Sequence, residues 1–217
     1  TPIMKNILII LLLSFTTMSA NFAQDFEGEI TYKLAYKNLP EEMGIYKAML
    51  PKSSKLIIKN HMSKMQQNMS ALIKMDIVSN AKTDYILIMV NALGKKIAYE
   101  PDVEEMKQGV YSVELKDDIK VIEGYKCNKA VIKDTADNLI TYWYTKDLPS
   151  YNNSNLPNVD IEGFPMEYIV KQNGMTVRAT VSKIDKKSID DSEFELKKGY
   201  EKKTKEEIEE MMGGMKF

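Results

Sequence analysis

Apolar and polar residues alternate along much of the chain, the period-two pattern of strands that bury one face. The alternation is regular after Glu27, where Ile30, Tyr32 and Leu34 fall on one side and threonine and lysine residues fall on the other. Since side chains at i and i+2 share a face of a strand, this segment predicts a half-buried antiparallel strand. The same pattern predicts further strands at 55–60, 64–69, 72–78, 85–90, 95–99 and 110–115.

The second half of the chain is organised around residues 119–169. Its predicted elements are a strand-like run over 120–133 entered through Glu123-Gly124, a polar turn at 134–138, an aromatic strand over 138–145, a long loop, and a strand that starts at Gly163-Phe164-Pro165. Asn173-Gly174 then lies between two alternating runs, which predicts a two-residue type I′ hairpin. A further short strand is expected to carry Phe194 and Leu196.

Two segments have helical patterns. Pro40 followed by two glutamates is typical of a helix start, so a short helix is predicted over 40–50. Thr204 and Glu207 form a capping box that predicts a second helix over 204–212. The fold class is therefore mainly β, of the α+β type, with one domain as the expectation for this length.

The first residues predict a targeting segment. Lys5 precedes an unbroken apolar run over 7–13, and small residues follow near Ala20 and Ala23, the pattern of a secretory signal peptide. The run is shorter than the roughly 20 apolar residues that a membrane-spanning helix needs. We therefore expect a signal peptide at 1–23, a single β domain at 24–217, and an exported protein without a transmembrane span.

The cysteine count and the net charge limit the covalent links and the classes of partner that the protein can have. Cys127 is the only cysteine, so no disulfide within the chain and no lipid anchor directly after the signal are expected, and a buried core thiol is the common case. The chain carries 30 basic and 31 acidic residues, and its net charge of −1 is not the clustered basic excess of a nucleic-acid binder.

Residues with metal or catalytic chemistry form no strong pattern. His61 lies near several methionines, which favours copper(I) in principle, but 15 methionines also suit an adaptable core. With one histidine, one cysteine and no glycine elbow around a serine, few nucleophile–base pairs can form. We expect no enzyme activity, no cofactor and no metal site.

The aromatic residues of the second half have two interpretations, core packing or an apolar concavity on a curved sheet. Burying an acyl chain of about 14 carbons contributes on the order of 10 kcal/mol. Association costs of about 4–15 kcal/mol offset most of it, so reversible carriage is physically reasonable.

Four segments carry a resemblance to a known family: Ile122–Ala130, Tyr142–Leu148, Glu162–Tyr168 and the closing Phe194–Glu207. They resemble domain-of-unknown-function family 4412, secreted proteins typical of Bacteroidota, over about residues 27–207. The GLPGLI family is a looser match, because Glu162-Gly-Phe-Pro-Met-Glu167 stands in place of its eponymous segment. The resemblance implies a curved, incomplete antiparallel β-barrel of the LolA/LolB type with short covering helices, and it supplies no catalytic residue.

The hypothesis that follows is an exported envelope protein that binds a lipid or acyl chain in the concave face of its sheet. The alternative is a non-catalytic protein–protein interaction or structural module with a self-filled core. The ligand-binding candidates are Trp143, Phe164, Met166, Tyr168, Met65 and Met69 as lining, with Met43, Tyr46 and Leu50 as a lid.

Overall fold

A computed structural model of the chain describes residues 26–41, 47–48, 50–68, 73–102, 111–134, 139–148, 161–172 and 174–211. Its described strands form one 12-stranded sheet in the order β12-β6-β5-β4-β3-β2-β1-β11-β10-β9-β8-β7. All neighbouring strands pair antiparallel except β12 and β6, which pair parallel. The elements are β1 (Gly28–Lys37), β2 (Ser53–Lys59), β3 (Met62–Asn68), β4 (Ile73–Asn80), β5 (Tyr85–Ala92), β6 (Lys95–Tyr99), β7 (Tyr111–Ile122), β8 (Tyr125–Asp134), β9 (Leu139–Thr145), β10 (Phe164–Gln172), β11 (Met175–Lys186), the 3-10 helix η2 (Asp191–Phe194), β12 (Glu201–Lys203) and α3 (Lys205–Met211).

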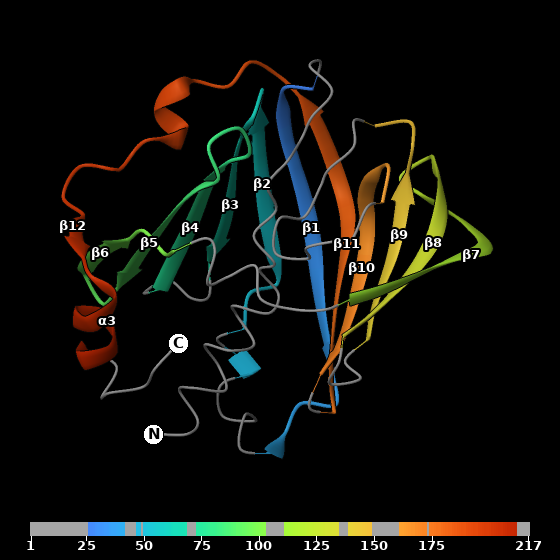
Figure 1. The fold of residues 1–217 in the computed structure, drawn as a ribbon, viewed down its shortest axis with the longest axis horizontal. Coiled ribbons are helices and arrows are strands. Elements are labelled where there is room, and N and C mark those ends of the chain that lie inside the picture. Colours follow the sequence, from blue (N-terminus) through green and yellow to red (C-terminus); the bar gives the residue numbers. More distant parts are fainter. Residues whose placement is uncertain are drawn as a thin grey trace.

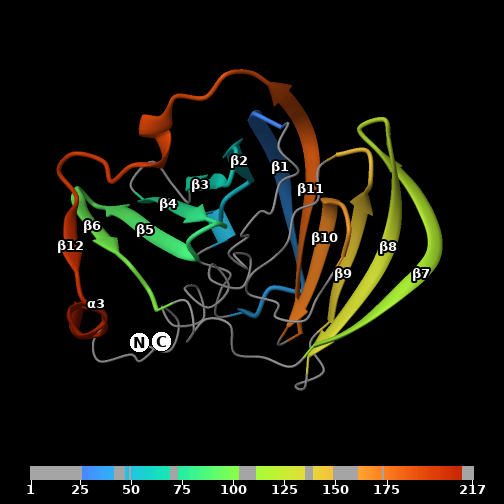
Figure 2. The ribbon, with the colours of Figure 1, turned by 45° about the horizontal axis from the view of Figure 1, so that its top comes forward.

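The sheet is open and strongly curved. Strands β1 and β11 form its middle, where the first long strand pairs with the last (Figure 1). The two halves curl toward the same side, as the turned view shows (Figure 2). We call the concave side the inner face and the convex side the outer face. The mainly β, incomplete antiparallel barrel that the sequence predicts is confirmed.

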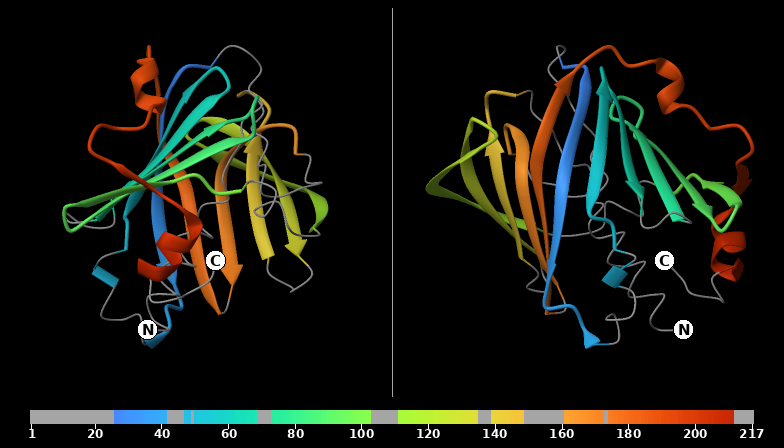
Figure 3. Two further views of the ribbon diagram at one scale, coloured as in Figure 1. Left: turned by 60° about the vertical axis from the view of Figure 1, so that its left-hand side comes forward. Right: turned by 180° about the vertical axis from the view of Figure 1, so that it is seen from behind.

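The segment 187–203 crosses the outer face from β11 to β12, and we call it the strap (Figures 2 and 3). Its Ile189 and Phe194 pack on Ile57, Leu87 and Met89, which strand alternation places on the outer face. A second, larger cluster covers the inner face of both halves of the sheet. The strap thus closes one half of the outer face with its own small core.

Two predicted elements differ from the structure. The predicted run over 120–133 is a hairpin, because Glu123 (φ 48°) and Gly124 (φ 82°) both adopt left-handed backbone conformations and turn the chain. Phe194 lies in the 3-10 helix η2 rather than in a strand, since Asp190 caps this segment by accepting a hydrogen bond from the Ser192 N–H (2.8 Å). The exposed pair Asp117-Asp118 lies at a register shift inside β7.

The C-terminal helix is confirmed as α3, together with its capping box. The Thr204 N–H donates to Glu207 Oε2 (2.8 Å) and the Glu207 N–H donates to Thr204 Oγ1 (3.3 Å). The predicted helix over 40–50 lies largely outside the described residues. Leu50, at the end of this predicted helix, is among the described residues and packs on Met175 and Val177.

Candidate ligand-binding face

The inner face is assembled from rows of directly paired residues that run across the strands. Because facing residues in neighbouring antiparallel strands share a side of the sheet, the register fixes the composition of each row. Three consecutive rows contain no charged residue. They are Val181-Tyr32-Ser54-Gln67-Met75-Val90-Ile97, Ile184-Ile30-Leu56-Met65-Ile77-Ile88-Tyr99 and Leu115-Ala130-Tyr142-Tyr168-Ala179-Leu34.

Tyrosines occupy the middle of this face. The ring of Tyr168 lies 5.7 Å from that of Tyr32 and 6.2 Å from that of Tyr142, measured between centroids. Burial raises the pKa of Tyr168 and of Tyr36 far above the ordinary phenol value, so both hydroxyls stay neutral. The Tyr32 hydroxyl donates to the Pro165 carbonyl (2.8 Å). The centre of the inner face is therefore aromatic, uncharged and able to form hydrogen bonds.

Four of the predicted site residues are buried at the inner face, either in its rows or packed against them. Met65 and Tyr168 are buried members of the inner rows. Met166 is fully buried at the register shift near the start of β10. Leu50 is buried against Val177, the inner-face neighbour of Tyr36, so it covers one end of the β1–β11 pair.

Trp143 and Phe164 lie outside the three uncharged rows. Trp143 lies between Tyr142 and Tyr144 in a regular strand, so it points to the outer face when its neighbours point inward. Its ring lies 5.4 Å from Lys120 Nζ and 5.6 Å from Lys129 Nζ. Phe164 pairs with Thr145 at the start of β10 and is buried in the larger cluster, against which Trp143 also packs.

The remaining three candidates, Met43, Tyr46 and Met69, lie outside the described residues.

The outer face holds buried charges that the sequence did not reveal. Lys64 is fully buried between Ile57 and Val78 of the neighbouring strands and pairs with Glu193 of the strap. Asp76 pairs with Lys197 of the strap. These partners are more than 100 positions apart in sequence, so local pattern carries no signal for them.

Glu167 is a buried carboxylate on the outer face of the other half, with 3 % of its side chain exposed. Lys120 Nζ donates to its Oε1 (2.8 Å), and the Thr180 hydroxyl donates to its Oε2 (2.7 Å). Both oxygens are therefore occupied from within the protein, which is typical of a structural ion pair.

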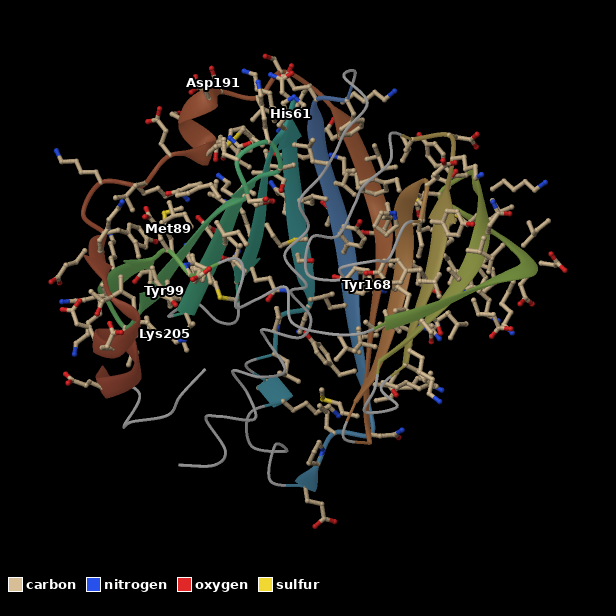
Figure 4. All side chains as sticks on the ribbon, in the orientation of Figure 1. His61, Met89, Tyr99, Tyr168, Asp191 and Lys205 are labelled. Carbon is tan, nitrogen blue, oxygen red and sulfur yellow. The ribbon has the colours of Figure 1, made fainter. Side chains whose placement is uncertain are left out.

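The copper(I) alternative finds no support among the described residues. His61 is exposed in the turn between β2 and β3, as Figure 4 shows. Met62 packs with the outer cluster, and Met65 belongs to the inner one. Burial raises the pKa of the Cys127 thiol, which keeps it protonated, in accord with the expected core thiol.

One end of the inner face reaches solvent at β7, the last strand of the described sheet. Leu115, Ile119 and Val121 are 64 %, 57 % and 67 % exposed. Their partners across β8 are Ala130, Asn128 and Lys126, so they continue the inner face to its edge.

A polar cleft of about 360 Å³ lies at the opposite edge of the sheet, between β6, β12 and the start of α3. Lys202 Nζ donates to Glu100 Oε1 within it (2.6 Å), and this ion pair lowers the pKa of Glu100. Lys203, which also lines the cleft, pairs with Glu201 and Glu207.

Residues 153–200 match the family described as domain of unknown function (DUF4412). The likeness to DUF4412 is limited to this segment of the chain. The match includes β10, β11 and most of the strap, which are the middle of the sheet and the segment that closes its outer face. No curated protein sequence matches the chain.

Solved structures show where else this fold occurs. PNGF-II aligns with a TM-score of 0.57 and 17 % identity over 87 % of this chain. The alignment covers 34 % of PNGF-II, so the chain spans about a third of that protein's length. The likeness concerns the fold.

Two further structures align with lower TM-scores than PNGF-II. LprF from Mycobacterium bovis has a TM-score of 0.35 and 10 % identity, covering 75 % of this chain and 88 % of its own. A LolA superfamily protein from Nitrosomonas europaea aligns with a TM-score of 0.28 and 10 % identity. The alignment covers 82 % of this chain and 93 % of that protein.

Proposed function

We propose that the protein binds an apolar ligand, a lipid or an acyl chain, on the inner face of its sheet. The observation that carries the proposal is the run of three uncharged rows across that face. A sheet whose inner face served only as a core would need no apolar side chains at its open edge, yet Leu115, Ile119 and Val121 extend the apolar surface into solvent there.

The inner rows also suit a guest in chemical terms. Met65 and Met75 provide polarizable, adaptable side chains beside the tyrosines. Small-molecule sites are mostly apolar with a few placed polar groups, which is the composition of these rows. The side chains are buried in the structure, so a ligand reaches them by opening the interior, and β7 is the end at which the apolar surface is already accessible.

Native mass spectrometry of the purified protein tests this proposal. We expect a bound species of lipid mass, released on unfolding and identifiable after extraction. If extensive search finds no lipid and the protein takes up no acyl-chain probe at micromolar concentration, the proposal fails and the protein is a protein–protein interaction module instead.

We further propose that the protein acts outside the cytoplasm after removal of residues 1–23. The apolar run at 7–13 and the small residues before Gln24 support this. Among the described residues, no helix is long and apolar enough to cross a membrane. An intact-mass measurement on protein recovered from its native host should give an unmodified N-terminus at Gln24; an N-terminus at Met4 or an acylated residue contradicts export as a free protein.

A further inference from the structure

Two buried polar atoms on the inner face have no hydrogen-bond partner in the described part of the chain. They are Ser54 Oγ and Gln67 Oε1. Each residue is 2 % exposed, and the two are direct cross-strand neighbours in β2 and β3. A buried polar group without a partner is strongly unfavourable, so native proteins rarely keep two side by side without a reason.

A neighbouring pair on the same strands shows the usual arrangement. Ser63 of β3 and Ser79 of β4 are buried on the same face and hydrogen-bond each other through their hydroxyls (2.7 Å). Ser54 and Gln67 are as close in register but do not satisfy each other. The difference points to a partner that comes from outside the chain.

The position of the pair indicates what that partner is. Tyr32 flanks Ser54 on one side and Met75 flanks Gln67 on the other, within an uncharged row. An amide oxygen accepts hydrogen bonds only, and a serine hydroxyl donates or accepts. The partner must therefore present an O–H or N–H group. A carboxylate or phosphate would bring a negative charge to an acceptor in a row that holds no cation, which is costly in a buried site.

We infer that Ser54 and Gln67 recognise the head of an acyl lipid whose polar group is uncharged and carries a hydrogen-bond donor, such as a hydroxyl or an amide. This inference rests on the proposed function and specifies its ligand class. Met75 in the same row and Met65 in the neighbouring row then contact the start of the acyl chain.

Displacement of 1-decylpyrene, a fluorescent hydrocarbon without polar groups, tests the assignment. Competitors are 1-monooleoylglycerol, methyl oleate and oleate, which share one chain and differ in the head. For the wild-type protein we expect monooleoylglycerol to compete about tenfold better than methyl oleate, the factor given by one to two well-formed hydrogen bonds, and oleate to compete worst.

Gln67→Met should reduce the tenfold preference to about one when each competitor is compared at the variant's own decylpyrene affinity. Its melting temperature should equal or exceed that of the wild type, because the variant removes an unsatisfied group. Gln66→Met is the matched control, since Gln66 lies on the outer face of the same strand. Ser54→Ala, with exposed Ser53→Ala as its control, provides an independent second pair.

The outcomes separate the two proposals. If decylpyrene does not bind, the proposed function fails and this assignment fails with it. If decylpyrene binds but the wild type does not prefer monooleoylglycerol, or if Gln67→Met keeps the preference, only the head-group assignment is overturned. A marked drop in the melting temperature of both Gln67→Met and Ser54→Ala also overturns it, since the two groups would then be satisfied parts of the core, for instance through a buried water.

Discussion

The two faces of the sheet differ in whether all of their buried polar groups have partners within the described chain. On the outer face, Lys64 and Asp76 each pair with a charged residue of the strap, and Glu167 has both oxygens occupied. On the inner face, Ser54 and Gln67 keep polar atoms without a partner among the described residues. These outer-face charges are paired within the chain itself, whereas two polar atoms of the inner face keep unused hydrogen-bonding capacity among the described residues.

Under the proposed function, the outer-face ion pairs hold the fold and the unpartnered polar positions of the inner face serve the ligand. Changes on the outer face should alter stability without altering binding. Changes at the polar positions of the inner face should do the reverse. The following predictions probe this division.

The largest loss of stability should come from breaking the Lys64–Glu193 pair. Glu193→Ala leaves a fully buried lysine without its partner, which we expect to cost about 3 kcal/mol of unfolding free energy. Urea denaturation measures it, with exposed Glu195→Ala on the same strap as the control. A loss below about 1 kcal/mol would mean that the strap does not stabilise the outer face.

Glu167→Gln should cost about 2 kcal/mol, because hydrogen bonds from Lys120 and Thr180 lose their charged acceptor. Glu162→Gln is the control, since its side chain is 79 % exposed. Ligand uptake should be unchanged in both variants. Reduced uptake in Glu167→Gln alone would assign this carboxylate a role in binding.

The inner tyrosines predict a loss of stability at alkaline pH. Burial raises the folded-state pKa of Tyr36 and Tyr168, so their contribution is complete below the unfolded value of about 10. It declines above that pH because the unfolded chain releases the proton first, by up to about 1.4 kcal/mol per pH unit for each tyrosine. Tyr168→Phe should flatten the decline between pH 10 and 11; an unchanged slope would argue against a neutral, buried Tyr168.

Trp143→Phe should have the smallest effect, about 1 kcal/mol or less of stability from weakened contacts with Lys120 and Lys129. Its affinity for an apolar probe should match that of the wild type, because the ring lies on the outer face. A fivefold or greater fall in affinity, measured in the same titration, would place Trp143 in the binding site after all.

Much of the fold could be read from the sequence because its signal is local. The alternation around Ile30 and Tyr32 predicts β1, and the Thr204–Glu207 capping box predicts the start of α3. The hairpin at Glu123-Gly124 was missed as a turn because the apolar pattern continues on both sides of it. Backbone torsion at these two residues, rather than hydropathy, decides the chain reversal.

The candidate site could be predicted only in part. Met65 and Tyr168 follow from strand alternation together with a curved sheet. Ser54 and Gln67 were not found, because a lone serine and a glutamine become notable only when their burial and lack of partners are known. Pairing of β2 with β3 brings Ser54 and Gln67 together. The row that they share extends to β11 because β1 pairs with β11, a strand far away in sequence.

Photo-crosslinking with an acyl lipid that carries a diazirine in its chain tests the central claim most directly. Peptide mapping by mass spectrometry then reports which face the chain contacts. The account predicts adducts on inner-face residues, with Met65, Met75 and Tyr168 the foremost, and competition by unlabelled lipid. Adducts confined to outer-face residues such as Met62, Met89 or Trp143, or no adduct that unlabelled lipid can suppress, would contradict ligand binding on the inner face.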